Sequence, residues 1–212
     1  MRSVGAATLA ALLLAGCGPK ALTLPADPVD RAATCGVVAA ASARAATADI
    51  KAPLPFEAQG RILHYPLLAA SEGERFETAT ANAVSKRMSA LQDDITSGEW
   101  EALVPQCATA YPLAGRLDVK LPSDDFDAEL GCDEMGKFLS QALQAQEVQY
   151  AGPLGEYRDL ERKFDTILGP GLRSRVGKEL KPQLELRAKA MAATVKLGSP
   201  VAVMRQCVER FG

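Results

Sequence analysis

A stretch of twelve residues that ends in cysteine occurs twice in this chain, and the second copy begins 97 residues after the first. Residues 24–35 read LPADPVDRAATC and residues 121–132 read LPSDDFDAELGC, so that one leucine, one proline, two aspartates and the cysteine are identical. A chain that carries one segment twice is built from repeated structural units. The sequence therefore predicts two similar halves.

The similarity continues to the end of the chain after a three-residue insertion in the second copy, near residue 148. Beyond that point equivalent positions lie 100 residues apart, and identical residues follow one another in the same order without further gaps. An ordered series of this kind indicates duplication of one ancestral unit. The identical pairs are Pro53/Pro153, Leu54/Leu154, Arg75/Arg175, Arg87/Arg187, Gly98/Gly198, Gln106/Gln206 and Cys107/Cys207.

Each half is predicted to contain three helices, followed by a short helical segment that carries a cysteine. Alanine is abundant and aromatic residues make up only 5% of the chain, which favours helices packed closely through small side chains. The first helix begins at Asp27 or Asp124, because an aspartate N-cap accepts backbone N–H groups, and runs to about Ala46 or Gln146. We predict an all-α fold of two tandem three-helix repeats that form a disulfide-stapled helical bundle.

The middle helix is clearest in the second half, where an apolar stripe at helical spacing runs from Tyr157 to Leu168. Gly169-Pro170-Gly171 is predicted to end it, because glycine and proline break helices. In the first half Pro66 interrupts the equivalent region, so that helix should be shorter or kinked.

The third helix of each half shows apolar residues that step by four, three and four positions. Gly98 and Gly198 are predicted to stop these helices in a left-handed conformation. The apolar positions are Val84, Met88, Leu91 and Ile95 in the first copy, and Leu184, Ala188, Met191 and Val195 in the second.

Four of the five cysteines belong to the repeated pattern. Three pairings are possible, and the duplication favours Cys35–Cys107 and Cys132–Cys207, because one ancestral unit had to close its own bond. Each such bond closes a loop of about 75 residues. In the chain-entropy account, closing it raises the free energy of unfolding by roughly 4 kcal/mol. The chain has no C-x-x-C motif, widely spaced cysteines and a single histidine, which argues against a thioredoxin-like redox site and against zinc.

The fifth cysteine follows a short apolar run, Val4 to Leu14, behind Arg2. Roughly ten apolar residues are too few to span a bilayer, but they suit the central region of an export signal. The run ends in Leu14-Ala15-Gly16-Cys17, which resembles the lipobox of bacterial lipoprotein signal peptides. The resemblance implies cleavage before Cys17 and attachment of diacylglycerol and a palmitate-type acyl chain to that residue. The alternative is an ordinary secretory signal with a chance cysteine.

These patterns predict five parts of the chain. The resemblance makes residues 1–16 a lipoprotein signal peptide and residues 17–26 a lipidated N-terminus and tether. Residues 27–109 form the first helical repeat, 110–123 a linker, and 124–212 the second repeat. Whether the two repeats share one core or stand as two lobes is left open.

The expected location is the bacterial cell envelope. By the same resemblance, Gly18 in place of aspartate favours the outer membrane, with the protein facing the periplasm. A formal net charge of −2, from 24 basic and 26 acidic residues, gives no electrostatic footprint for nucleic acid. The expected partners are the membrane, through the lipid anchor, and a protein or polymer; no cofactor is expected beyond the lipid on Cys17.

Candidate catalytic groups are few. His64 is the single imidazole, and because it pairs with Phe164 in the second copy it is interpreted as a partly buried helix position. The carboxylate groups are interpreted as helix starts or solvated surface, and no catalytic or metal-ligating residue is assigned. They are Asp27 with Asp30, Glu72 with Glu74, Asp93 with Asp94, and Asp124 with Asp125 and Asp127.

Arg87 and Arg187 occupy equivalent positions on the third helices. The simpler interpretation is a salt bridge or a stem that covers apolar surface; the alternative is a pair of anion-binding groups near a pseudo-twofold axis. Lys178, Lys181 and Lys189 make the second of these helices more basic, which indicates a solvated face, with contact to anionic lipid or polymer as the alternative. Trp100 is expected to pack in the core or at a hinge.

The favoured function is a non-enzymatic envelope lipoprotein that serves as a scaffold or binding module. One alternative is a carrier of a small apolar ligand in an interhelical cavity, and another is a hydrolase that uses carboxylates. An exposed apolar groove over a filled core would favour the binding module, and a large apolar cavity would favour the carrier. Carboxylates with raised pKa values that converge in a cleft would favour the enzyme.

Overall fold

The computed structural model describes residues 22–49 and 51–212. The predicted signal peptide, Cys17 and the first part of the predicted tether lie outside these residues. Over the described ranges every regular element is a helix, and no strand is present. The prediction of an all-α, disulfide-stapled fold is therefore confirmed, whereas the internal repeat stays a prediction.

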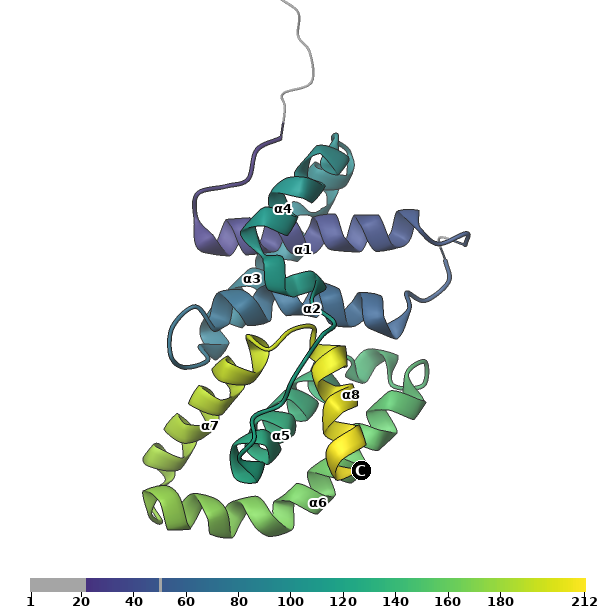
Figure 1. Ribbon diagram of the computed structural model, residues 1–212. Helices are drawn as coiled ribbons and strands as arrows, with labels where there is room; N and C mark the ends of the chain where they lie inside the picture. Colours follow the sequence, from purple (N-terminus) through teal and green to yellow (C-terminus); the bar gives the residue numbers. More distant parts are fainter. Residues whose placement is uncertain (1–21, 50) are drawn as a thin grey trace, which may run out of the picture.

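The first half of the chain forms the upper part of the molecule in Figure 1 and the second half forms the lower part. The segment that follows η2 crosses from one to the other. The helices of the first half are α1 Pro28–Ala45, α2 Phe56–Ala70, α3 Thr78–Thr96, η1 Trp100–Leu103, α4 Val104–Ala110 and η2 Pro112–Gly115. Those of the second half are α5 Asp125–Ala142, η3 Gln144–Gln146, α6 Ala151–Val176, α7 Leu180–Val195 and α8 Pro200–Phe211.

The first helix of each half begins as predicted. The side chain of Asp27 accepts the backbone N–H of Asp30 at 2.9 Å, and the side chain of Asp124 accepts that of Asp127 at 3.0 Å. These bonds satisfy donors that the first helical turn leaves unpaired. α5 ends at Ala142 rather than at Gln146, and the short η3 follows it.

The prediction that Gly169-Pro170-Gly171 ends the middle helix of the second half is wrong. α6 continues through Pro170 to Val176, because Leu172 extends the apolar stripe and is buried like Leu168. This burial outweighs the backbone hydrogen bond that the proline removes. The helix ends instead at Gly177, which has φ +84°. α2 is shorter than α6, with 15 residues against 26, but Pro66 lies inside α2, which continues to Ala70, so the proline does not end this helix as the prediction implied.

Only one of the two glycines predicted to adopt a left-handed conformation has a positive φ. Gly198 has φ +154°, and a Cβ atom there would lie 2.9 Å from the carbonyl oxygen of Arg116. This close approach admits only glycine. Gly98 follows α3 without a positive φ. α7 ends at Val195 with Lys196 as its cap, before Gly198, whose φ lies far from the left-handed helical value, so the predicted helix stop is wrong for both glycines.

Two hydrophobic cores are present, one in each half. The first includes Val38 of α1 and Val84 of α3, and the second includes Met135 of α5 and Phe164 of α6. α2 contributes to both cores, because Tyr65 lies in the first and Leu67 in the second. The halves are thus neither one bundle nor two separate lobes; they are two cores that share α2.

Backbone hydrogen bonds join the halves as well. The N–H of Phe76 donates to the carbonyl of Ala188 at 2.9 Å, and the N–H of Ser199 donates to that of Arg116 at 2.8 Å. The predicted linker 110–123 takes part in this packing, since its Val119 is buried in the second core. It is a packed crossover between the halves.

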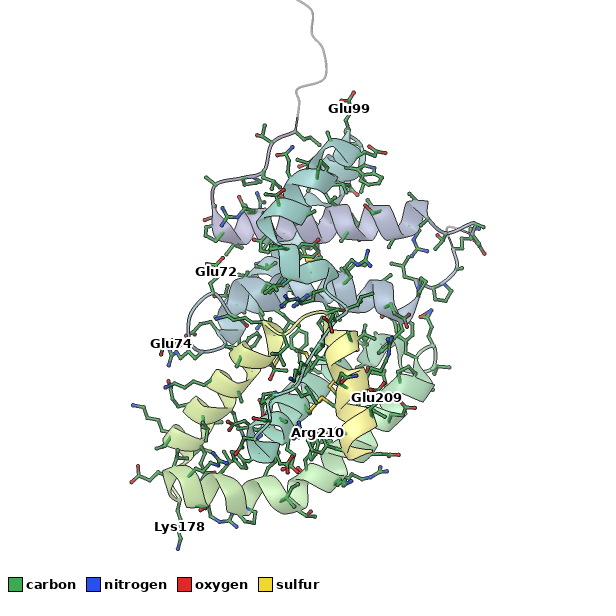
Figure 2. The ribbon with its side chains drawn as sticks, viewed as in Figure 1. Glu72, Glu74, Glu99, Lys178, Glu209 and Arg210 are labelled. Atoms are coloured by element: carbon green, nitrogen blue, oxygen red, sulfur yellow. A yellow bond between two sulfur atoms is a disulfide. The ribbon has the colours of Figure 1, made fainter. Side chains whose placement is uncertain are left out.

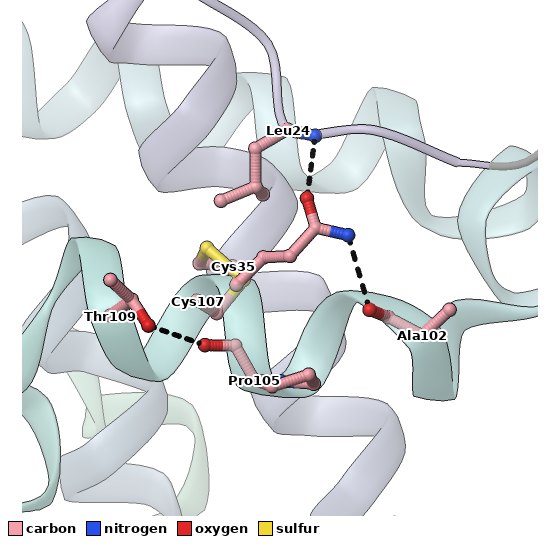
Figure 3. Close-up of a disulfide and its surroundings, with 7 residues drawn as sticks. Leu24, Cys35, Ala102, Pro105, Cys107 and Thr109 are labelled. Atoms are coloured by element: carbon pink, nitrogen blue, oxygen red, sulfur yellow. Dashed lines mark hydrogen bonds between the residues drawn. A yellow bond between two sulfur atoms is a disulfide. The ribbon is translucent and has the colours of Figure 1, made fainter.

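Both favoured disulfides are present. Cys35–Cys107 joins α1 to α4, and Cys132–Cys207 joins α5 to α8; all four cysteines are buried. Figure 3 shows the first bond, where the backbone N–H of Leu24 approaches Gln106 from the predicted tether. Leu22 and Leu24 are partly buried against the first core. The described end of the tether therefore lies on the body of the protein.

Candidate functional site

The two arginines singled out in the sequence both have carboxylate partners. Arg87 on α3 binds Asp30 on α1 at 2.7 Å, and Arg187 on α7 binds Asp133 at 2.8 Å and Glu134 at 2.5 Å on α5. Burial alone would lower the pKa of Arg187, but its hydrogen bonds to these carboxylates raise it, so the guanidinium stays charged. Each arginine ties two helices of its own half together, which matches the simpler interpretation.

His64 lies between the halves and is completely buried rather than partly buried. Its Nε2 is 2.9 Å from the carbonyl oxygen of Val195 on α7 and donates to it, while Nδ1 has no hydrogen-bond partner among the described residues. Burial lowers the pKa of His64 to about 4, although the nearby Val195 and Ala114 backbone groups oppose that shift. The imidazole is therefore neutral at pH 7.

The candidate carboxylates do not form a reactive pair. Asp93 and Asp94 are exposed, as are Glu72 and Glu74 on the loop between α2 and α3 (Figure 2). The pKa of Glu129 is raised by burial and by Asp125, but Arg210 and Lys163 oppose the rise. Trp100 packs against the first core, as expected for a packing role.

An open groove lies between the start of α3 and the first turns of α7. It has a volume of about 620 Å³. Leu180 and Leu184 form one wall, and they are 69% and 54% exposed. Side chains four residues apart lie on one face of a helix, so the two leucines present a continuous apolar edge. We call this site, formed by Phe76, Ala79, Leu180, Leu184 and Ala188, the α3/α7 groove.

The rim of the α3/α7 groove carries charges of both signs. Arg75 bridges it, with 2.7 Å to Glu77 and 3.2 Å to Glu185. Glu72 and Glu74 lie on the loop near one end, and Lys178 lies at the opposite end of α7 (Figure 2). Lys196 also reaches this loop, with its Nζ 2.7 Å from the carbonyl oxygen of Gly73, so charges of both signs flank the apolar side chains of the groove.

The apolar pattern of the third helix predicts burial of Leu184, and this prediction is wrong. The sequence predicts Leu184, Met191 and Val195 on one buried stripe, but only the last two are buried. All the buried residues of α7 lie in its C-terminal half, because that half packs into the second core. The sequence feature that indicates the groove is Leu180. It falls outside the predicted apolar stripe and extends the apolar edge towards the N-terminus of α7.

The first half contains a separate cavity of about 610 Å³ between α1, α2 and α3. Val37, Ile62 and Met88 provide apolar walls, while Gln59 and Gln92 provide amides. This mixed lining could hold a molecule with both apolar and hydrogen-bonding parts.

No protein-family model, curated protein or solved structure matches the chain. Across the described ranges, no helix is both long and apolar enough to cross a bilayer. In the same part of the chain, no three histidine, cysteine, aspartate or glutamate side chains are grouped as metal ligands would be.

Proposed function

We propose that the chain is a non-enzymatic lipoprotein of the bacterial envelope that works as a binding module for a partner protein. The observation that carries this proposal is the α3/α7 groove, where two leucines on adjacent turns of α7 are exposed outside both hydrophobic cores. Exposed apolar side chains gathered in one concave place are typical of interaction sites. A sugar polymer offers few apolar groups to match them, so a protein is the favoured partner.

The dimensions of the groove fit a short helix. Leu180 and Ala188 lie eight residues apart on α7, which corresponds to about 12 Å or two helical turns. An amphipathic helix inserts apolar side chains spaced by three, four or seven residues into such a groove. The mixed charges of the rim favour a partner helix that carries charges of both signs beside its apolar stripe.

The first prediction concerns the α3/α7 groove. We expect a photoreactive amino acid at position 184 to cross-link one discrete protein in intact cells, and Leu180→Glu to weaken that cross-link at least tenfold. The reason is that loss of one buried leucine contact removes about 1.5–3 kcal/mol. The readout is mass spectrometry of the adduct, which should map to an amphipathic helix of the partner.

The matched control is the same photoreactive group at Ile167, which is also an exposed apolar position but lies on α6. Leu180→Glu should leave the free energy of unfolding within about 0.5 kcal/mol of the parent, because the side chain is exposed. Equal cross-linking from positions 167 and 184, or adducts with lipid or glycan only, would contradict the proposal.

The second prediction concerns the anchor, which rests on the lipobox resemblance. We expect mature protein that begins at Cys17, carries acyl chains and sediments with membranes, whereas Cys17→Ser releases the chain from them. Several acyl chains hold a protein far more firmly than one chain. Mass spectrometry of the N-terminal peptide is the measurement, and an uncut N-terminus at residue 1 would overturn the anchor.

A carrier of a small apolar ligand is the second candidate function. The cavity between α1, α2 and α3 favours it, because its volume of about 610 Å³ is in the range of small-molecule sites. It ranks second because glutamine and serine side chains share its lining with the apolar residues.

A further inference from the structure

A smaller cavity, of about 280 Å³, lies on another face of the first half, between α1, α2 and the α4–η2 segment. Most of its wall is made of small apolar side chains, and the buried Cys107 lies behind it. No aspartate or glutamate lines it. The alanines of the wall are Ala39, Ala43, Ala58, Ala108 and Ala114.

Two polar groups of α2 face this apolar wall. Tyr111, which also lines the cavity, has a buried hydroxyl with no hydrogen-bond partner among the described residues. Tyr65 is itself buried, with a relative exposure of 6%. Its ring is fixed edge-on against Tyr111, with 5.4 Å between the ring centroids. A tyrosine held in this way presents a hydroxyl donor at small entropic cost, because its rotamer is already set.

Arg61 lies one helical turn before Tyr65, on the same face of α2. Its guanidinium is exposed, and no carboxylate of the described part of the chain lies within 4 Å of it. Burial raises the pKa of Tyr65, and the charge of Arg61 opposes that rise. The cavity lining therefore combines one cation, Arg61, and the hydroxyl groups of Ser42, Tyr65 and Tyr111 with an apolar wall that contains no competing acid.

We propose that this cavity binds a small organic monocarboxylate. A guanidinium takes a carboxylate through two parallel N–H···O bonds, and the Tyr65 hydroxyl can donate a third hydrogen bond. The alanine wall would cover a short acyl chain. An inorganic anion would leave that wall in contact with water, so the favoured ligand carries an apolar tail. This site is separate from the α3/α7 groove, and it does not depend on the docking function proposed there.

The test uses hexanoate as the probe and hexan-1-ol as its neutral match, measured by calorimetry on the mature chain. We expect saturable binding of hexanoate, at least tenfold weaker binding of the alcohol, and at least tenfold weaker binding of hexanoate to Arg61→Gln. Tyr65→Phe should weaken hexanoate severalfold. Arg162→Gln on α6 is the control, since it removes another exposed guanidinium, one paired with Asp159, from a different helix. This variant should bind hexanoate as the parent does.

Arg61→Gln keeps the experiment decisive even if Tyr65→Phe unfolds the chain, because Arg61 is exposed and its replacement should leave the melting temperature unchanged. Equal binding of hexanoate and hexan-1-ol would overturn the proposal. The proposal would also be overturned if Arg61→Gln bound hexanoate as tightly as the parent does. It would be overturned as well if the parent showed no saturable binding at hexanoate concentrations up to about 10 mM.

Discussion

Replacement of both Cys132 and Cys207 with alanine is expected to lower the free energy of unfolding by about 4 kcal/mol. The bond joins residues 75 positions apart, so its loss releases a long loop in the unfolded chain. Since domains of this size have a total stability of about 5–15 kcal/mol, the double variant should lose a large share of its stability. Urea unfolding followed by circular dichroism measures the change.

The matched comparison is the double variant Cys35→Ala/Cys107→Ala, whose loop spans 72 positions. The two loops are nearly equal, so the entropic account predicts nearly equal losses for both variants. The parent protein, unfolded and treated with a thiol reductant so that its disulfides open, provides a control without any substitution. A loss below about 1 kcal/mol for both double variants would contradict the account, because the unfolded-state contribution would then be absent.

A second large effect is expected from acid. The pKa of His64 is lowered to about 4 in the folded protein, from 6.5 in the unfolded chain, because the ring is buried. As the pH falls below 6.5, the unfolded chain takes up a proton that the folded protein does not, so stability falls until the pH reaches about 4. Between pH 7.5 and 5 the parent should lose about 2 kcal/mol through this one group.

His64→Phe is expected to remove this pH dependence. The chain contains no other histidine, and phenylalanine occupies the position paired with His64 in the second copy. The variant loses the hydrogen bond to Val195, which costs about 1 kcal/mol at every pH, but its stability between pH 7.5 and 5 should be nearly constant. Urea unfolding at each pH, for the parent and the variant, gives the difference.

Tyr150→Phe is the matched control for His64. The hydroxyl of Tyr150 donates to the carbonyl of Leu54 at 2.6 Å, so this variant also loses one buried hydrogen bond between distant segments. It leaves His64 in place and should keep the pH dependence of the parent. If His64→Phe and the parent lose the same stability on acidification, the buried imidazole does not cause the loss.

Local signals in the sequence predicted local structure well. Asp27 and Asp124 cap their helices as expected, because an N-cap depends only on the next three residues. The symmetry of the cysteine pattern predicted both disulfides. The helix-breaking residues around Pro170 gave a wrong prediction, because the burial of Leu172 depends on residues far away in the sequence.

The arrangement of the two halves could not be predicted from one helix at a time. α2 serves both cores because Tyr65 and Leu67 point to opposite sides of the helix, and both sides are apolar in the sequence. The α3/α7 groove depends on the same arrangement, since Phe76 comes from the first half and Leu184 from the second. Neither residue marks an interaction site until the halves are brought together.

Leu22 and Leu24 lie on the first core, which limits how far the protein can stand from a lipid on Cys17. Five residue steps separate Cys17 from Leu22, and an extended chain covers about 18 Å in that number of steps. In an acylated protein of this kind, the short segment between Cys17 and Leu22 would keep the first half close to the lipid headgroups. A partner helix would then be bound close to the membrane surface, because the protein would stay attached there and would not diffuse freely.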